Sequence, residues 1–65
     1  MILIVNGERT ETSAATLAVL LDELEFEHRH LAIAVNHEVV PRRTWAEAAL
    51  EDGDEVEIIT PRQGG

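Results

Sequence analysis

The chain has 65 residues and a mass of 7.2 kDa, which is enough for one small domain but not for a second hydrophobic core. Its hydrophobic fraction of 45% excludes a disordered chain, and no apolar run approaches the roughly 18 residues of a membrane span. The absence of cysteine excludes disulfides, thiolate metal sites and thiol nucleophiles. Because the first residues lack the basic start of a signal peptide, the sequence predicts a cytoplasmic protein that folds on its apolar core alone.

The charge of the chain narrows the classes of partner. Thirteen acidic and five basic residues give a net charge of −8 and a pI of about 4.6. Nucleic acids and anionic membranes are recognised through basic patches, and the only local one is Arg42-Arg43. A basic protein surface is the more natural partner. All five basic residues are arginine, so no lysine is present to accept an isopeptide bond.

The first half of the chain predicts a β-hairpin followed by a helix. Residues 2–5 and 8–12 have strand-like composition, and the Asn6-Gly7 pair between them is a strong signal for a type I′ turn. Leucines recur at helical spacing within residues 17–25, which places them on one face of a helix. Thr16 is the expected N-cap, with Ser13 as the alternative. Phe26 is expected to pack where the helix ends, before a polar connection over residues 27–30.

A third strand is predicted over residues 31–36, where large and small side chains alternate. The large side chains are expected to face the helix and the small ones to face away; these are Leu31, Ile33 and Val35, and Ala32 and Ala34, respectively. Residues 36–38 then turn the chain into a brief return strand over residues 39–40. Pro41 ends that strand because proline has no amide hydrogen to donate.

The last third of the chain predicts a helical turn and a final strand. The turn spans residues 44–50 and is expected to bury Trp45 and Leu50. Residues 51–54 form a tight turn rich in aspartate and glycine. In the strand over residues 55–60, Val56 and Ile58 should point inward, whereas Ile59 should point outward with Glu55 and Glu57.

This element order predicts an α+β domain. A single helix covers only one face of a sheet, so the helix should cross one face of a mixed sheet of four or five strands. The helix also supplies a crossover that allows the first and last strands to lie parallel at the sheet centre. Residues 1–60 would form the single domain, and residues 61–65 a flexible tail that ends in Gly-Gly.

Few residues suit conventional catalysis. His28, His30 and His37 are candidate zinc ligands or bases, with Glu27 or Glu38 as further ligands, but a zinc site needs at least three ligands in a closed geometry. Solvated loop histidines are the simpler interpretation. Ser13 has no evident histidine and aspartate companions, and no glycine-rich phosphate loop is present. The sequence therefore does not predict an enzyme.

The strongest chemical signal is the terminal pair Gly64-Gly65. Glycine has no Cβ, so such a tail can thread a narrow tunnel in another enzyme and present its carboxylate there. That carboxylate is ionised at neutral pH and inert to nucleophiles. Activation to an acyl-adenylate would make it electrophilic, after which a sulfur or amine nucleophile could be attached.

The whole chain resembles the ThiS family of sulfur carriers. The features that carry the resemblance stand in order along the sequence: Asn6-Gly7, Thr16-Leu17 with Leu20-Leu21, Val35-Asn36, Val39-Val40-Pro41-Arg42, Trp45, Asp52-Gly53-Asp54 and Gly64-Gly65. The resemblance implies the β-grasp, ubiquitin-like fold. It also implies a protein cosubstrate in the formation of the thiazole half of thiamine, rather than a catalyst.

The resemblance further implies the partners of this chemistry. A ThiF-like enzyme would adenylate the carboxylate of Gly65 with ATP and magnesium, and Gly64 would allow entry into its tunnel. Sulfur from a donor such as a cysteine desulfurase would replace AMP, and thiazole synthase would take the sulfur from the thiocarboxylate. The chain itself would bind no cofactor or metal. Docking is expected through the outer sheet face and the tail, with Ile59, Pro61, Arg62 and Gln63. Residues 61–63 are more polar and stiffer than the small apolar residues expected before the glycines.

Three other functions fit the same features. Another thiocarboxylate carrier, such as the small subunit of molybdopterin synthase, would share the fold and the Gly-Gly end. A ubiquitin-like modifier would attach its terminal carboxyl group to protein lysines. In a plain interaction module the Gly-Gly pair would be incidental, and deleting Gly64-Gly65 would leave function intact.

Overall fold

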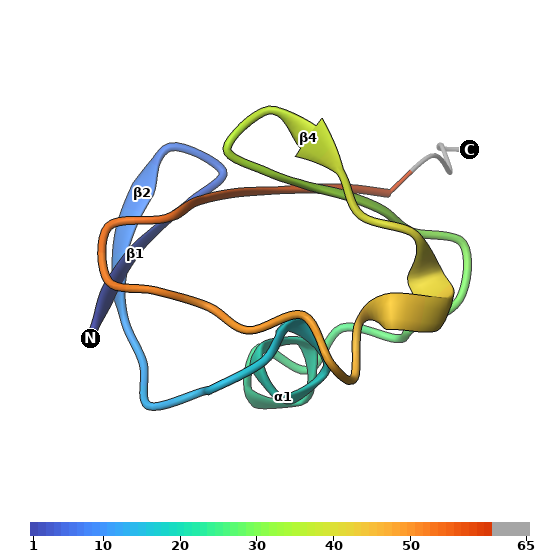
Figure 1. Ribbon diagram of the computed structural model, residues 1–65, viewed down its shortest axis with the longest axis horizontal. Coiled ribbons are helices and arrows are strands. Elements are labelled where there is room, and N and C mark those ends of the chain that lie inside the picture. Colours follow the sequence, from blue (N-terminus) through green and yellow to red (C-terminus); the bar gives the residue numbers. More distant parts are fainter. Residues whose placement is uncertain (61–65) are drawn as a thin grey trace.

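The computed structural model describes residues 1–60, which fold into a mixed sheet with one helix on one face (Figure 1). The elements are β1 (Ile2–Val5), β2 (Glu8–Glu11), α1 (Leu17–Glu23), β3 (Ala32–Val35), β4 (Glu38–Val39), the 3₁₀ helix η1 (Arg42–Thr44) and β5 (Glu55–Ile59). No helix in this part of the chain is long and apolar enough to cross a membrane.

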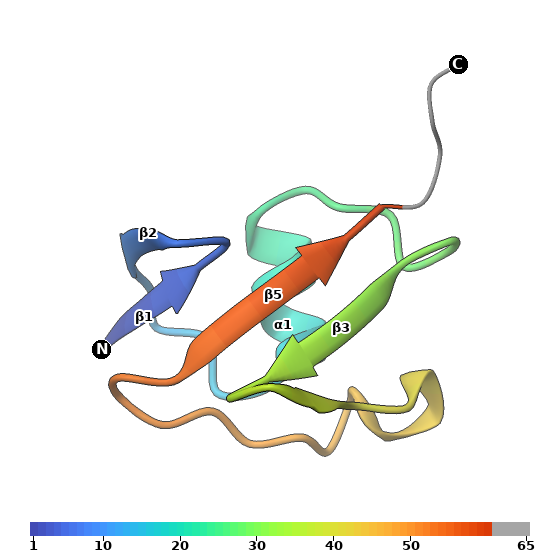
Figure 2. The same cartoon turned by 90° about the horizontal axis from the view of Figure 1, so that it is seen from above.

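The five strands lie in the order β2-β1-β5-β3-β4. β1 and β5 pair in parallel near the centre, with Val5 opposite Val56, and the other neighbouring pairs are antiparallel. Figure 2 shows β5 between β1 and β3, with α1 behind the sheet. The predicted α+β architecture and the parallel central pair are confirmed.

Two tight turns join β1 to β2 and β3 to β4. Asn6 and Gly7 have φ of 51° and 83°, and Asn36 and His37 have φ of 52° and 71°. Positive φ at both central residues is the signature of the type I′ turn, whose twist matches that of the flanking strands. The first turn is the one predicted from Asn-Gly. The second has histidine at a position where glycine is preferred.

The helix begins as predicted and ends two residues early. Thr16 is the N-cap, since its Oγ1 accepts a hydrogen bond from the amide of Val19 at 3.4 Å. The expected last residue, Glu25, has φ of 65° and lies outside the helix. Its amide donates to the carbonyl of Asp22, and the amide of Phe26 donates to the carbonyl of Leu21. This paired pattern is a Schellman motif, and it turns Phe26 back onto the core as expected.

The core lies between α1 and the inner face of the sheet. Its fully buried side chains are Leu3, Leu17, Leu20, Leu21, Ile33 and Val56. Trp45 and Leu50 are also buried, as predicted, and Leu31 and Val35 pack against the core. Ala34 departs from expectation, because it belongs to the outer face by register yet is only 8% exposed. Its cross-strand neighbours, Val39 and Glu57, carry longer side chains that flank its methyl group.

Several element boundaries differ from those predicted. β2, β3 and β5 are each shorter, and β4 comprises Glu38–Val39 rather than residues 39–40. The amide of Val40 still donates to the carbonyl of Ile33, at 2.9 Å, although the strand has ended. The helical turn begins at Arg42, two residues earlier than expected, because Pro41 starts it and the amide of Thr44 donates back to the Pro41 carbonyl.

Candidate functional site

The outer face of the sheet is the side not covered by α1. Strand register assigns to it, from β2 across to β4, Arg9 and Glu11, Ile2 and Ile4, Glu55, Glu57 and Ile59, Ala32 and Ala34, and Val39. Two large apolar side chains stand exposed here, with Val39 at 78% and Ile59 at 54% exposure. The outer face therefore combines exposed apolar side chains with the carboxylates of Glu11, Glu55 and Glu57.

Ile59 is the last residue of β5, the strand that leads into the tail. It pairs with Ala32 of β3, so its side chain stands beside a small residue on the outer face. The predicted outward direction of Ile59 is confirmed. The other expected docking residues, Pro61, Arg62 and Gln63, and the reactive pair Gly64 and Gly65 lie outside the described residues.

Two asparagine side chains hold β5 from its two sides. Oδ1 of Asn6 accepts the amide hydrogen of Ile58 at 2.8 Å, and Oδ1 of Asn36 accepts that of Glu55 at 3.0 Å. Each asparagine occupies the first position of a type I′ turn, where a short polar side chain tolerates positive φ. The turn residues thus also fix the strand that carries the tail, a role that the sequence did not indicate.

The turn at Asp52-Gly53-Asp54 anchors the start of β5. Oδ1 of Asp52 accepts the amide hydrogen of Ile2 at 2.6 Å, and the amide of Gly53 donates to the carbonyl of Ile2 at 2.7 Å. Asp54 caps the turn through the amide of Glu51 and also accepts from the side chain of Asn36. These bonds give a structural reason for the aspartates on both sides of the glycine in this turn.

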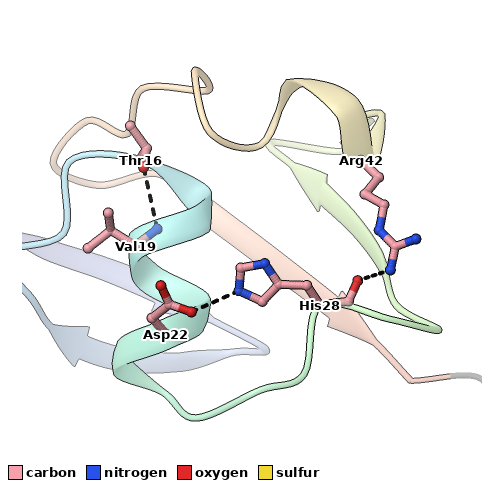
Figure 3. A network of polar contacts seen from close by, with 5 residues as sticks. All are labelled: Thr16, Val19, Asp22, His28 and Arg42. Carbon is pink, nitrogen blue, oxygen red and sulfur yellow. Dashed lines mark hydrogen bonds and ion pairs between the residues drawn. The ribbon is translucent and has the colours of Figure 1, made fainter.

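The histidines do not form a common site. His30 and His37 are exposed, in line with solvated loop residues, and His37 lies 3.4 Å from a carboxylate oxygen of Glu55. His28 also lies in a loop, but it is more enclosed than the other two. Its side chain is half-buried, and Figure 3 shows its Nε2 directed toward Oδ1 of Asp22, 3.0 Å away. The loop folds back against α1, where the carbonyl of His28 also accepts a hydrogen bond from Arg42.

His28 and Arg42 also border the indole of Trp45. The rings of His28 and Trp45 meet edge-on with centroids 6.3 Å apart, and the guanidinium of Arg42 lies 6.0 Å from the indole centroid. The indole Nε1 donates to the carbonyl of Val40 at 2.9 Å. This arrangement ties η1, α1 and the loop between α1 and β3 together.

Within residues 1–60 the structure contains neither a cavity nor a group of three or more side chains placed to hold a metal ion. A substrate bound by this part of the chain would have to lie on an open surface.

Comparisons with known proteins place the chain in a family. The model of the ThiS family matches residues 2–65. The chain is 30% identical to the sulfur carrier protein ThiS of Escherichia coli, with full coverage of both chains. It is 41% identical to part of a thiazole synthase of Paramagnetospirillum magneticum, of which it spans 20% of the length.

A solved structure gives the same answer for the fold. The crystal structure of the thiamine biosynthesis protein ThiS from Geobacter metallireducens superposes with a TM-score of 0.84 and 29% identity, and both chains are covered in full. This likeness confirms the predicted β-grasp, ubiquitin-like fold. The prediction of a carrier rather than an enzyme is confirmed by the family match and the Escherichia coli relative. From its match over nearly all of its length and its agreement in fold, the chain belongs to the ThiS family.

Proposed function

We propose that this chain carries sulfur for the formation of the thiazole of thiamine, as a protein cosubstrate whose reactive group is the carboxylate of Gly65. A ThiF-like enzyme transfers AMP from ATP to this carboxylate with release of pyrophosphate, using magnesium. A sulfur donor such as a cysteine desulfurase then attacks the acyl-adenylate through its persulfide and AMP leaves, after which a thiol reduces the S–S bond of the resulting acyl disulfide and releases the thiocarboxylate. Thiazole synthase takes the sulfur, and the carrier returns as the carboxylate.

The observation that carries this proposal is the full-length match to a sulfur carrier together with the Gly-Gly end. The Escherichia coli relative is named a sulfur carrier, and the match covers 100% of both chains. In the described part of the chain, β5 is the last element, and side chains on both sides fix its position. A rigid strand before a short tail suits a protein that must present its terminal carboxyl group to several enzymes in turn.

The thiazole branch is favoured over other thiocarboxylate pathways by one relative. The chain matches a fifth of the length of a thiazole synthase at 41% identity, so a ThiS-like segment and that enzyme occur there in one polypeptide. Two activities joined in one chain commonly act in succession, and linkage raises the effective concentration of one for the other. We therefore place thiazole synthase among the partners of this chain.

Docking would use the outer face near the end of β5 together with the tail. Ile59 is half-exposed and apolar, and we assign to it the central contact, with Pro61, Arg62 and Gln63 extending the contact toward the glycines. Transfer of one such side chain from water into an interface stabilises it by about 1.5–3 kcal/mol. The chain itself would hold neither ATP nor magnesium, and all steps would take place in the cytoplasm.

The test is intact mass spectrometry after incubation with ATP, a ThiF-like enzyme and a sulfur donor. Conversion to a thiocarboxylate adds about 16 Da, a shift that oxidation of Met1 to the sulfoxide would mimic. A thiol-selective alkylating reagent separates the two, because a chain without cysteine can take the label only at a newly formed sulfur. We expect labelling that requires ATP.

A chain that lacks Gly65 serves as the matched control and should take no label. Labelling of the natural chain without ATP, or equal labelling of the truncated chain, would refute the proposal. Covalent attachment of the chain to other proteins in cells, without a thiocarboxylate, would instead indicate a ubiquitin-like modifier.

A further inference from the structure

One side of β5 has an open hydrogen-bonding edge over its last residues. The pairing of β1 with β5 consists of Ile4 with Glu55 and Val5 with Val56, whereas β3 pairs with β5 as far as Ile59. In Figure 2, β5 continues past the end of β1. The β1 side of Glu57–Ile59 therefore has no strand beside it, although the β3 side is fully paired.

The side chain of Asn6 marks where the edge opens. At the turn, the backbone amide of Asn6 donates to the carbonyl of Val56. The side-chain Oδ1 of Asn6 accepts the amide hydrogen of Ile58, in place of the backbone carbonyl that a longer β1 would offer. Residues of a strand point their backbone groups to alternate sides, so the carbonyl of Ile58 and the amide of Thr60 face the same side as the amide of Ile58. Neither group has a hydrogen-bond partner among residues 1–60.

The two outer edges of the sheet are less suited to pairing with another chain. β2 is rich in charged side chains, with Glu8, Arg9 and Glu11, and charge on an edge strand discourages pairing. β4 has two residues and ends before Pro41. The open edge of β5 differs because it leads directly to the tail and lies beside the exposed side chain of Ile59.

We propose that an extended backbone segment of the activating enzyme pairs with this edge of β5 and adds a strand beside residues 58–60 when the tail enters the enzyme. The inference rests on the proposed function, because it assigns a contact to the same docking event. Strand addition uses main-chain hydrogen bonds for affinity and leaves side chains to provide specificity. The enzyme segment would accept from the amide of Thr60 and donate to the carbonyl of Ile58.

The position of proline in the sequence is compatible with this pairing. Proline has no amide hydrogen, so a proline on the paired side of a strand removes a hydrogen bond. If the complex extended the strand through the next residue, alternation would assign Pro61 to the β3 side, together with Glu57 and Ile59. In the proposed complex, the missing hydrogen therefore does not lie on the edge that the enzyme segment would cover.

The first test compares Thr60→Pro with Thr60→Ala in the adenylation reaction. The proline variant removes the amide hydrogen from the open edge, whereas the alanine variant removes only the side chain. Thr60 is exposed, and its amide has no partner within the described residues, so both variants should fold. We expect the KM for Thr60→Pro to rise about tenfold, with kcat little changed and Thr60→Ala close to the natural chain.

The second test measures amide hydrogen exchange of the natural chain by NMR, with and without the activating enzyme. The amide of Thr60 should exchange rapidly in the isolated chain and become protected in the complex. Rapid exchange of Thr60 in the complex, or equal KM values for the two Thr60 variants, would overturn the inference. If the enzyme activates neither the natural chain nor Thr60→Ala, the proposed function itself fails, which is a separate outcome.

Discussion

His37 occupies the second position of a type I′ turn with φ of 71°, a conformation in which its Cβ crowds the backbone. Glycine has no such penalty, and the equivalent turn at Asn6-Gly7 already uses it. The contact of His37 with Glu55 involves two well-exposed side chains and therefore contributes little to stability. The cost of this residue thus lies in its backbone rather than in its side chain.

We therefore expect His37→Gly to raise the free energy of unfolding by about 0.5–1 kcal/mol, because relief of the strained φ outweighs the added flexibility of the unfolded chain. Urea denaturation would measure the change. His37→Ala serves as the control, since it removes the imidazole but keeps the Cβ. If the alanine variant were stabilised as much as the glycine variant, the backbone would not be the cause.

Single residues also show what sequence reasoning could not reach. The inward positions of Trp45 and Leu50 followed from their size and apolar character. The burial of Ala34 did not, because it depends on which residues of neighbouring strands stand beside it. The contacts of His28 with Asp22 and Trp45 likewise depend on how a loop folds back against α1, and no periodic pattern of residues in the sequence predicts the path of that loop.

At the scale of elements, β5 depends on a side chain from a turn that is distant in sequence. Oδ1 of Asn6 accepts the amide hydrogen of Ile58 from a residue 52 positions away along the chain. The pattern of alternating residues predicted the strand, and Asn-Gly predicted the turn, but neither indicated that the turn completes the hydrogen bonding of the strand. Local patterns specify elements, whereas links between elements require their arrangement in space.

Asn6→Gly tests this link without straining the turn, because glycine accepts the φ of 51° and removes only the acceptor. Loss of this hydrogen bond should lower the free energy of unfolding by about 0.5–1.5 kcal/mol, because the amide of Ile58 is only partly buried and water can replace the acceptor. Amide exchange at Ile58 should accelerate more than exchange at residues of β2. Asn6→Asp keeps an acceptor oxygen and should lose less stability; an equal loss in both variants would show that the hydrogen bond is unimportant.

Exposed apolar side chains lie on both the sheet side and the helix side of the molecule. Ile59 lies on the outer face of the sheet at 54% exposure, and Val19 lies on α1 at 46% exposure. The sequence predicted the outward direction of Ile59 from strand alternation, and its docking role was a hypothesis based on its exposed position before the tail. It could not specify which neighbours surround Ile59 on the sheet, because the pairing of Ala32 with Ile59 joins strands 27 positions apart by residue number.

Ile59→Glu should therefore weaken association with the activating enzyme at least tenfold, since burial of an isoleucine contributes about 1.5–3 kcal/mol and a buried carboxylate adds a desolvation cost. Val19→Glu adds the same charge on the other side of the molecule and should load sulfur as the natural chain does. The KM of adenylation measures both. Equal KM values for the two variants, with both domains folded, would show that the outer face is not the docking surface.

Trp45 is the single tryptophan of the chain, and the structure buries its indole beside α1. Its emission should be shifted to short wavelength in the native protein and should move to longer wavelength when the domain unfolds, so each of the variants above can be followed without an attached dye. Because the indole lies in the core, its fluorescence should respond little to binding at the outer face of the sheet or at the end of the chain. A change in the Trp45 emission on binding to a partner enzyme would thus show that binding alters the core of the domain. An unchanged emission with full activity would show that the domain binds each enzyme in turn as a rigid body.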